Sequence, residues 1–107
     1  MANVAVLGAG GWGTSLAVML NRIGHTVTLW SAFADEIQAI RRFGEHRRLL
    51  PGVAVDPSIA LTTDITCAKD VDLVIMAVPS FAIRQTARLL RPVLSDGQIV
   101  ANAGKGL

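Results

Sequence analysis

The chain has few of the residues that stabilise small extracellular proteins. Its 107 residues include one cysteine, Cys67, four prolines and no tyrosine, and aromatic side chains occupy only 5% of positions. A single cysteine cannot form an intramolecular disulfide, which excludes a disulfide scaffold and is typical of a reducing compartment. We therefore expect a cytoplasmic protein. No group of cysteine and histidine has the spacing of zinc ligands, so we expect no metal site.

Charge of either sign is also scarce. Charged residues make up 17% of the chain and hydrophobic residues 51%, and ten Lys and Arg against eight Asp and Glu leave a net charge of +2. Disordered chains combine low hydrophobicity with high net charge, so disorder is excluded. The basic residues concentrate at Arg41, Arg42, Arg47 and Arg48, with Glu45 between them. This pattern is more typical of a solvated helix face than of a nucleic-acid surface, and a small phosphate-bearing ligand suits it better.

The first 21 residues carry no charge. Their length approaches the roughly 20 residues of a membrane-spanning helix. Four glycines, Asn3, Thr14 and Ser15 interrupt the segment, however, and it lacks the basic start of a signal peptide. The pattern predicts a buried strand, a glycine turn and a helix, with no membrane span.

Strand and helix patterns alternate along the chain. Apolar runs predict strands at 3–7, 25–30, 59–62, 71–78 and 98–101, and helical spacing predicts helices at 12–23, 34–43 and 80–90. We expect Asp35 and Glu36 in the first turn of the second helix, and Ser80 as the cap of the third. Residues 64–68 predict a short helical turn, and 45–57 predict a loop. Strands without polar alternation are buried on both faces, which favours a doubly wound parallel sheet in the order 3-2-1-4-5 with helices on both faces.

A glycine motif lies between the first strand and the first helix. Residues 8–13, Gly-Ala-Gly-Gly-Trp-Gly, match GxGxxG in the context that gives the spacing its meaning. Gly8 would permit the tight turn, Gly10 the approach of a pyrophosphate and Gly13 the close packing of helix on strand. The motif predicts a dinucleotide site in a Rossmann-type domain covering residues 1–107. A glycine turn without a ligand is the alternative, and Trp12 either packs over the turn or contacts the coenzyme.

The end of the second strand departs from the usual NAD pattern. An acidic residue about 20 positions beyond the glycines usually holds the ribose hydroxyls. Here the strand is followed by Ser31, Ala32 and Phe33, and the nearest acid is Asp35. NAD or NADP is therefore expected, with NADP slightly favoured because no carboxylate repels a 2′-phosphate. The arginines that could reach that phosphate from elsewhere are Arg41, Arg42, Arg47 and Arg48.

Five single residues are candidates for separate roles. His25 is expected at a turn, His46 in solvent and Cys67 in the core, while Phe81 suits either the core or the edge of the coenzyme cleft. Lys105 follows the fifth strand between two glycines, where a doubly wound sheet presents groups to its cleft. An exposed terminal lysine is the alternative for Lys105.

Five motifs occur in a specific order: Asn3 to Gly13, Gly24-His25 with Val27 and Trp30, Leu50-Pro51-Gly52, Val78-Pro79-Ser80 and Gly104-Lys105-Gly106. Together they resemble the N-terminal part of NAD(P)-dependent glycerol-3-phosphate dehydrogenases over essentially the whole chain. The resemblance implies hydride transfer between NAD(P)H and dihydroxyacetone phosphate, giving sn-glycerol 3-phosphate, which in bacteria feeds phospholipid synthesis. It places Lys105 near both nicotinamide and substrate. The cofactor-binding residues expected are Gly8, Gly10, Gly11, Trp12, Gly13, Phe33 and Lys105.

Three departures from that family concern the coenzyme. Gly11 stands where bacterial members usually carry serine, Leu49 replaces a tyrosine, and Ala32 and Phe33 stand where an arginine or histidine commonly meets the 2′-phosphate. The departure at Ala32 and Phe33 leaves the preference between NAD and NADP open.

The resemblance also implies that the chain is incomplete. The family's general-base lysine belongs to a C-terminal helical domain beyond these 107 residues, so we assign no catalytic residue here and expect the chain alone to be inactive. We expect a homodimer, because a sheet ending at its fifth strand leaves an open edge. A non-catalytic NAD(P)-sensing module would need the glycine motif but not Lys105. Another two-domain dehydrogenase, acting on a hydroxy acid or sugar acid, would not need the Leu-Pro-Gly and Lys-Gly motifs.

Overall fold

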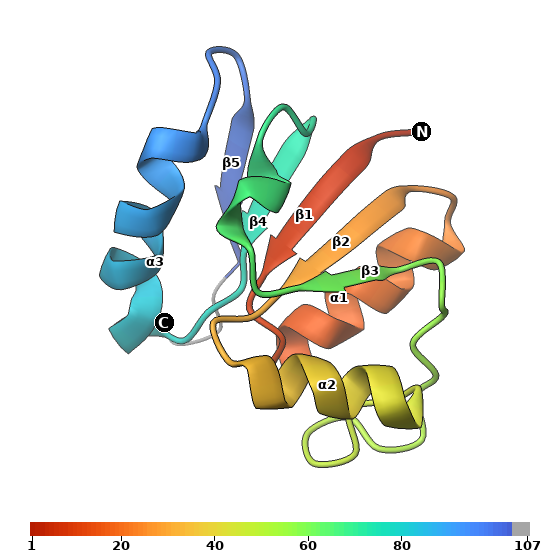
Figure 1. Cartoon of the computed structure of the whole chain (residues 1–107). Coiled ribbons are helices and arrows are strands. Elements are labelled where there is room, and N and C mark those ends of the chain that lie inside the picture. The colour runs from red at the N-terminus through yellow and green to blue at the C-terminus, as the bar shows by residue number, and fades with distance from the viewer. Residues whose placement is uncertain (104–107) are drawn as a thin grey trace.

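Five parallel strands form the centre of the molecule. The computed structural model describes residues 1–103, and its strands lie in the order β3-β2-β1-β4-β5 (Figure 1). The doubly wound order predicted from the sequence is therefore confirmed. Leu7, at the end of β1, pairs with Met76, at the end of β4, so the carboxyl ends of these two strands lie side by side. The strands are β1 (Asn3–Leu7), β2 (Thr26–Trp30), β3 (Ala60–Thr62), β4 (Leu73–Met76) and β5 (Ile99–Asn102).

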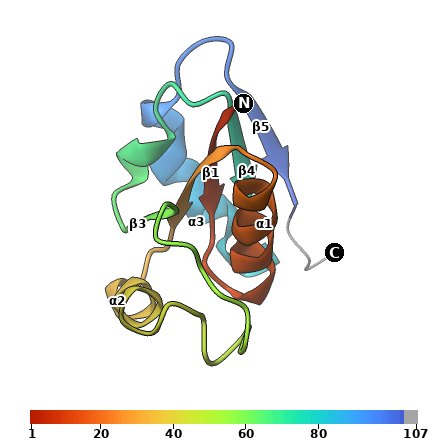
Figure 2. The ribbon, with the colours of Figure 1, turned by 90° about the vertical axis from the view of Figure 1, so that its right-hand side faces the viewer.

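Helices cover both faces of the sheet, as expected. α1 (Gly11–Arg22) and α2 (Ala34–Phe43) pack on one face, and α3 (Ile83–Leu90) packs on the other with a 3₁₀ turn at Ile65–Ala68 (Figures 1 and 2). The connections from β1 to β2 and from β2 to β3 run in one direction along the sheet. Right-handed crossovers therefore place α1 and α2 on the same face. The chain then returns past β1 to β4, and the same handedness puts the later elements on the opposite face.

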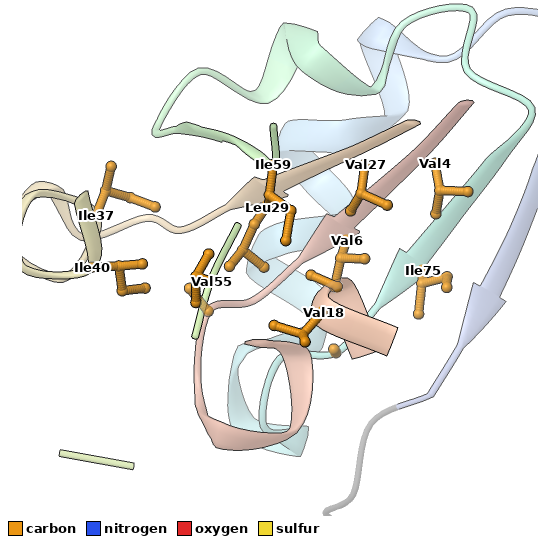
Figure 3. Close-up of a cluster of buried hydrophobic side chains, with 13 residues drawn as sticks. Val4, Val6, Val18, Val27, Leu29, Ile37, Ile40, Val55, Ile59 and Ile75 are labelled. Carbon is orange, nitrogen blue, oxygen red and sulfur yellow. The ribbon is translucent and has the colours of Figure 1, made fainter. Parts of the chain in front are cut away.

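The strand side chains alternate between two apolar cores. Val4 and Val6 of β1 pack toward α1, while Ala5 and Leu7 pack toward α3. Figure 3 shows Val4 and Val6 beside side chains from the neighbouring strands, with Val18 of α1 against them. Burying one such aliphatic side chain contributes about 1.5–3 kcal/mol. Because both faces of the sheet are covered, the strands carry apolar runs instead of polar alternation.

The end of α2 and the start of α1 differ in how their backbone groups are bonded. α2 has Asp35 and Glu36 in its first turn, as predicted, and stops at Gly44, whose N–H donates to the carbonyl of Ile40 at 2.8 Å. Gly44 has a φ of 69°, a left-handed conformation that glycine adopts without strain. α1 follows Gly10 and has no side-chain cap at its start. The first N–H groups of an α-helix have no partner inside the helix, and in α1 no side chain caps them.

The Ser80 cap predicted for the third helix is wrong. After Pro79 the chain makes a 3₁₀ turn at Ser80–Ala82, in which the N–H of Ala82 donates to the carbonyl of Pro79 at 2.9 Å. α3 then begins at Ile83 without a side-chain cap. The tighter backbone turn satisfies an early amide that the serine hydroxyl would otherwise bond. Elsewhere the predicted elements are present, and β1 and α2 have the predicted bounds.

Cys67 and His25 lie where the sequence indicated. Cys67 is half-buried against the α3 core, and burial together with the nearby Asp64 carboxylate raises the pKa of its thiol to about 11. His25 lies in the turn after α1 and accepts the backbone N–H of Ala2 at Nδ1, at 3.1 Å. Within residues 1–103, no helix combines the length and apolar character needed to cross a membrane. The same residues contain no group of three or more side chains placed to hold a metal ion.

Candidate functional site

A cleft of about 790 Å³ opens at the carboxyl ends of β1, β2 and β4. Ala32 and Phe33 line it after β2, and Pro79 and Phe81 line it after β4. The cleft therefore lies where the strand order reverses, which is where doubly wound sheets bind ligands. Phe33 is 70% exposed and Phe81 is 87% exposed, and such large apolar side chains at a cleft offer area to a flat ligand. Of the two roles considered for Phe81, the structure favours the cleft.

The glycine turn fits so closely against its surroundings that two of its positions admit no side chain. Gly8 has a φ of 122°, and a Cβ there would lie 2.8 Å from the backbone of Ala77. A Cβ on Gly13 would lie 1.7 Å from the carbonyl oxygen of Gly8. Gly10 differs, because the nearest atom to its Cβ would be a methyl carbon of Leu49 at 3.9 Å. Gly8 and Gly13 thus allow the turn and helix to pack, while Gly10 leaves space on the cleft side.

The start of α1 presents to this space backbone donors that have no partner within the helix. The N–H of Thr14 donates to the carbonyl of Gly10 at 3.0 Å, so the three preceding amides, those of Gly11, Trp12 and Gly13, have no partner within the helix. No acidic residue lies in the first turn of α1. A helix N-terminus carries the equivalent of about half a positive charge. The arrangement suits an anion such as a pyrophosphate.

Trp12 lines the cleft, so its contact with the coenzyme stays a prediction. Its side chain is 45% exposed, and its indole N–H donates to the backbone carbonyl of Ala103, just beyond β5. The ring therefore joins the start of α1 to the end of the neighbouring chain segment. Lys105, the candidate for substrate and coenzyme contact, lies outside the described residues.

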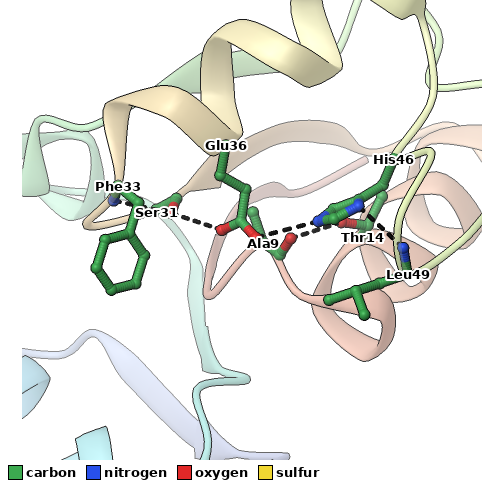
Figure 4. Close-up of polar contacts among 7 residues, drawn as sticks. All are labelled: Ala9, Thr14, Ser31, Phe33, Glu36, His46 and Leu49. Atoms are coloured by element: carbon green, nitrogen blue, oxygen red, sulfur yellow. Dashed lines mark hydrogen bonds and ion pairs between the residues drawn. The ribbon is translucent and has the colours of Figure 1, made fainter.

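A chain of hydrogen bonds connects the end of β2 to the loop after α2 (Figure 4). The backbone N–H of Phe33 donates to Ser31 Oγ at 3.0 Å, and Ser31 Oγ donates to one oxygen of Glu36 at 2.8 Å. The other oxygen of Glu36 lies 3.1 Å from His46 Nε2. The N–H of Leu49 donates to His46 Nδ1 at 3.3 Å. Since Nδ1 accepts a bond, the ring proton lies on Nε2 and points to the carboxylate.

The expectation that His46 is solvated is wrong. His46 is only 6% exposed, because its ring lies between Glu36 and the backbone of Leu49. Glu36 was expected only as a first-turn acid, yet its side chain also lines the cleft. This role of Glu36 was not predictable from the usual signal, which is an acid directly after β2. The available signal was Ser31 at the strand end with Glu36 five residues later.

The four arginines of the basic run have different surroundings. Arg41 donates to the carbonyl of Leu61 at 2.9 Å, and Arg42 and Arg47 lie over the ring of Phe43 at 5.4 and 3.8 Å from its centroid. Among these four, Arg48 is the one that lines the cleft. The sequence alone could not tell which of these arginines faces the cleft, because Arg47 and Arg48 lie in a loop after α2 and the residue spacing does not predict the path of a loop.

Comparison with known proteins identifies the group to which this fold and cleft correspond. The family model described as "NAD-dependent glycerol-3-phosphate dehydrogenase N-terminus" matches residues 3–107. The chain belongs to this family. It is 47% identical to the glycerol-3-phosphate dehydrogenase [NAD(P)+] of Moorella thermoacetica over 98% of its length, and 44% identical to that of Xanthomonas euvesicatoria over 96%.

Solved structures of this dehydrogenase family and of related enzymes share the fold. The crystal structure of the Coxiella burnetii glycerol-3-phosphate dehydrogenase matches 99% of the chain with a TM-score of 0.90 and 32% identity, over 33% of its own length. A ketopantoate reductase from Ralstonia eutropha matches 92% of the chain with a TM-score of 0.75 and 29% identity, over 32% of its length. The chain spans 32% of the Moorella relative and 30% of the Xanthomonas relative. With the family model's description, these shares indicate a match to the N-terminal third of the glycerol-3-phosphate dehydrogenases.

Replacing Glu36 by alanine should destabilise the fold more than replacing Asp35. Both acids lie in the first turn of α2 and lose the same favourable position at the helix N-terminus, worth about 0.3–1 kcal/mol. Glu36→Ala also leaves the buried His46 Nε2–H without its acceptor, which should cost about 2 kcal/mol more. Urea unfolding of both variants measures the difference. Equal losses for Asp35→Ala and Glu36→Ala would show that the Ser31–Glu36–His46 chain does not stabilise the fold.

Proposed function

We propose that the chain is the coenzyme-binding part of a glycerol-3-phosphate dehydrogenase. The observation that carries the proposal is the open side of Gly10 beside the first amides of α1, which have no partner within the helix, in a chain that the family model matches. The pyrophosphate of NAD(P) would lie against these amides, with the rest of the coenzyme along the cleft. The residues proposed to bind it are Gly8, Gly10, Gly11, Trp12, Gly13, Phe33 and Lys105.

The glycine at position 10 fits a site where a ligand lies against the backbone. A Cβ at Gly10 would meet only the side chain of Leu49, at 3.9 Å, so without a ligand nothing in the turn requires glycine there for space. Gly10 also has an ordinary φ of −72°, so backbone conformation does not require glycine either. The remaining reason is the close approach of a ligand to the backbone.

In the proposed reaction, the coenzyme would supply the hydride for the carbonyl carbon of dihydroxyacetone phosphate, and the carbonyl oxygen would take up a proton. We assign Lys105 to the substrate, where its ammonium group would hold the phosphate or polarise the carbonyl. A hydrogen bond from such a charged group contributes about 1.5–3 kcal/mol. We assign no general base within the 107 residues. The isolated chain should therefore bind coenzyme without turning over substrate.

We also propose a slight preference for NADP over NAD. No carboxylate directly follows β2, where Ser31, Ala32 and Phe33 stand. Glu36 lines the same cleft, but both of its oxygens are engaged, by Ser31 and His46. A carboxylate engaged in this way is poorly placed to accept both ribose hydroxyls of NAD. A cytoplasmic setting and a role in supplying phospholipid synthesis complete the proposal, on the strength of the family.

Replacing Gly10 and Gly13 by alanine should separate coenzyme binding from folding. Gly10→Ala should cost less than about 1 kcal/mol of stability but weaken NADPH binding about tenfold or more, because its methyl group enters the pyrophosphate space. Gly13→Ala should cost about 3 kcal/mol or prevent folding, since its Cβ overlaps the carbonyl of Gly8. Thermal unfolding and calorimetric titration of the chain with NADPH measure both effects. Undiminished NADPH binding by Gly10→Ala would contradict the proposed pyrophosphate site.

Activity should require the part of the family that lies beyond this chain. We expect the 107-residue chain to show no NADPH oxidation with dihydroxyacetone phosphate, and a fusion to the C-terminal two-thirds of the Moorella relative to be active. Lys105→Ala in that fusion should abolish turnover while NADPH still binds. Turnover by the short chain would refute the claim of inactivity. An inactive but folded fusion that binds NADPH would favour another dehydrogenase or a sensing module.

We propose that the chain also forms a homodimer through β5. Within residues 1–103 β5 is an edge strand, and its Ile99 and Val100 are exposed. Such an edge offers main-chain hydrogen-bonding groups and apolar area to a second copy. Light scattering over a range of concentrations should give the mass of a dimer, and Val100→Lys should shift it toward the monomer. A constant monomer mass at high concentration would contradict the dimer.

A further inference from the structure

Arg48 and Glu36 are the two charged residues among the described residues that line the cleft. Arg48 is the cationic one of the two. Arg48 also lines a second hollow, of about 540 Å³, which adjoins the cleft along Phe33 and Glu36. Within residues 1–103, no carboxylate forms an ion pair with Arg48. An exposed cation in a concave, largely apolar site attracts anionic groups.

The position of Arg48 corresponds to one end of the proposed coenzyme. In doubly wound sheets the ribose of the adenosine lies beyond the carboxyl end of the second strand, where an arginine can accommodate a 2′-phosphate. Ala32 and Phe33, the residues just beyond β2, line the same cleft as Arg48. Neither can bond a phosphate through its side chain. Arg48 comes from the loop after α2, far along the chain from β2, and supplies a positive charge at this end of the cleft.

The loop that carries Arg48 is fixed on both sides of it. His46, two residues earlier, is buried against Glu36, and its Nδ1 accepts the N–H of Leu49, the residue after Arg48. The N–H of Gly52 donates to a carboxylate oxygen of Glu45 at 2.8 Å. A Cβ on Gly11 would lie 3.0 Å from the carbonyl oxygen of Leu49, so this loop lies directly against the glycine turn. A cation on an ordered backbone loses less entropy on binding than one on a free loop.

Glu36 is the anion that opposes this role. Its carboxylate lines the same cleft and would repel a 2′-phosphate, but it is held toward Ser31 and His46 by bonds of 2.8 and 3.1 Å. A guanidinium can contact a phosphate through two parallel hydrogen bonds, whereas the carboxylate acts on it only through space. Direct paired contact is shorter and less screened than repulsion across an open cleft. The attraction to Arg48 should therefore exceed the repulsion by Glu36.

We infer that Arg48 binds the 2′-phosphate of NADP(H) and makes the chain select NADP(H) over NAD(H). The inference rests on the proposed coenzyme function and adds the residue that determines its specificity. Arg48 acts by direct contact with the phosphate, in place of a residue directly after β2.

The test compares two neighbouring arginines by calorimetric titration of the chain with NADPH, NADH, 2′,5′-ADP and 5′-ADP. Arg48→Gln should lower affinity for NADPH and 2′,5′-ADP about tenfold or more and leave that for NADH and 5′-ADP nearly unchanged. Arg47→Gln removes the same charge one residue away, from a side chain that lines the second hollow but not the cleft and lies on the ring of Phe43, and should leave all four affinities nearly unchanged. Arg48→Lys should retain part of the preference, since it keeps the charge and loses the paired geometry.

The outcomes separate this inference from the proposed function. Equal binding of NADPH and NADH by the unaltered chain, or an unchanged preference in Arg48→Gln, would overturn the role of Arg48 and leave coenzyme binding intact. Equal effects of Arg47→Gln and Arg48→Gln would also overturn it, because they would indicate only a general attraction of charge. Failure of all four nucleotides to bind the folded chain would overturn both the inference and the proposed function.

Discussion

The contact between Gly13 and Gly8 is the constraint on which the rest of the structure depends. The start of α1 lies so close to the end of β1 that a single methyl group at Gly13 would overlap the carbonyl oxygen of Gly8. This contact sets the direction of α1, and α1 in turn aims its first amides across the ends of β1 and β4. The contact of Gly8 with the backbone of Ala77 fixes the other side of the turn. Two positions without side chains therefore determine where the cleft opens and which backbone groups face it.

A second, polar constraint completes the other end of the cleft. Glu36 accepts hydrogen bonds from Ser31 and from His46, so one carboxylate joins β2, α2 and the following loop. Satisfied polar networks of this kind fix the relative positions of segments more uniquely than apolar contacts, because each donor has one acceptor at a defined direction. The loop from Glu45 to Gly52 thereby lies against the glycine turn. Its position follows from the bond of His46 to Glu36 of α2, whose other oxygen is held by Ser31.

The fold was predictable from the sequence because its signals are local. The apolar run of β1 and the helical spacing of α2 depend on residues within one segment, and strand order follows from the handedness of the crossovers. The burial of His46 was not predictable in this way, since it depends on a carboxylate ten residues away and on the path of an irregular loop. Ser80 shows the same limit at shorter range. Its position suited a cap, but backbone geometry after Pro79 satisfied the amide first.

The coenzyme end of the site shows why position in the sequence is a poor guide to charge in space. Judged along the chain, the end of β2 lacks both the acid typical of NAD binding and the arginine typical of NADP binding. In the structure a carboxylate from the first turn of α2 and a guanidinium from the following loop both line the cleft there. The carboxylate is engaged by two protein groups, whereas the guanidinium forms no ion pair within residues 1–103. In the proposed coenzyme site, the hydrogen bonds of Glu36 to Ser31 and His46 would leave Arg48 as the charge that meets a ligand, and the proposed selectivity depends on that difference.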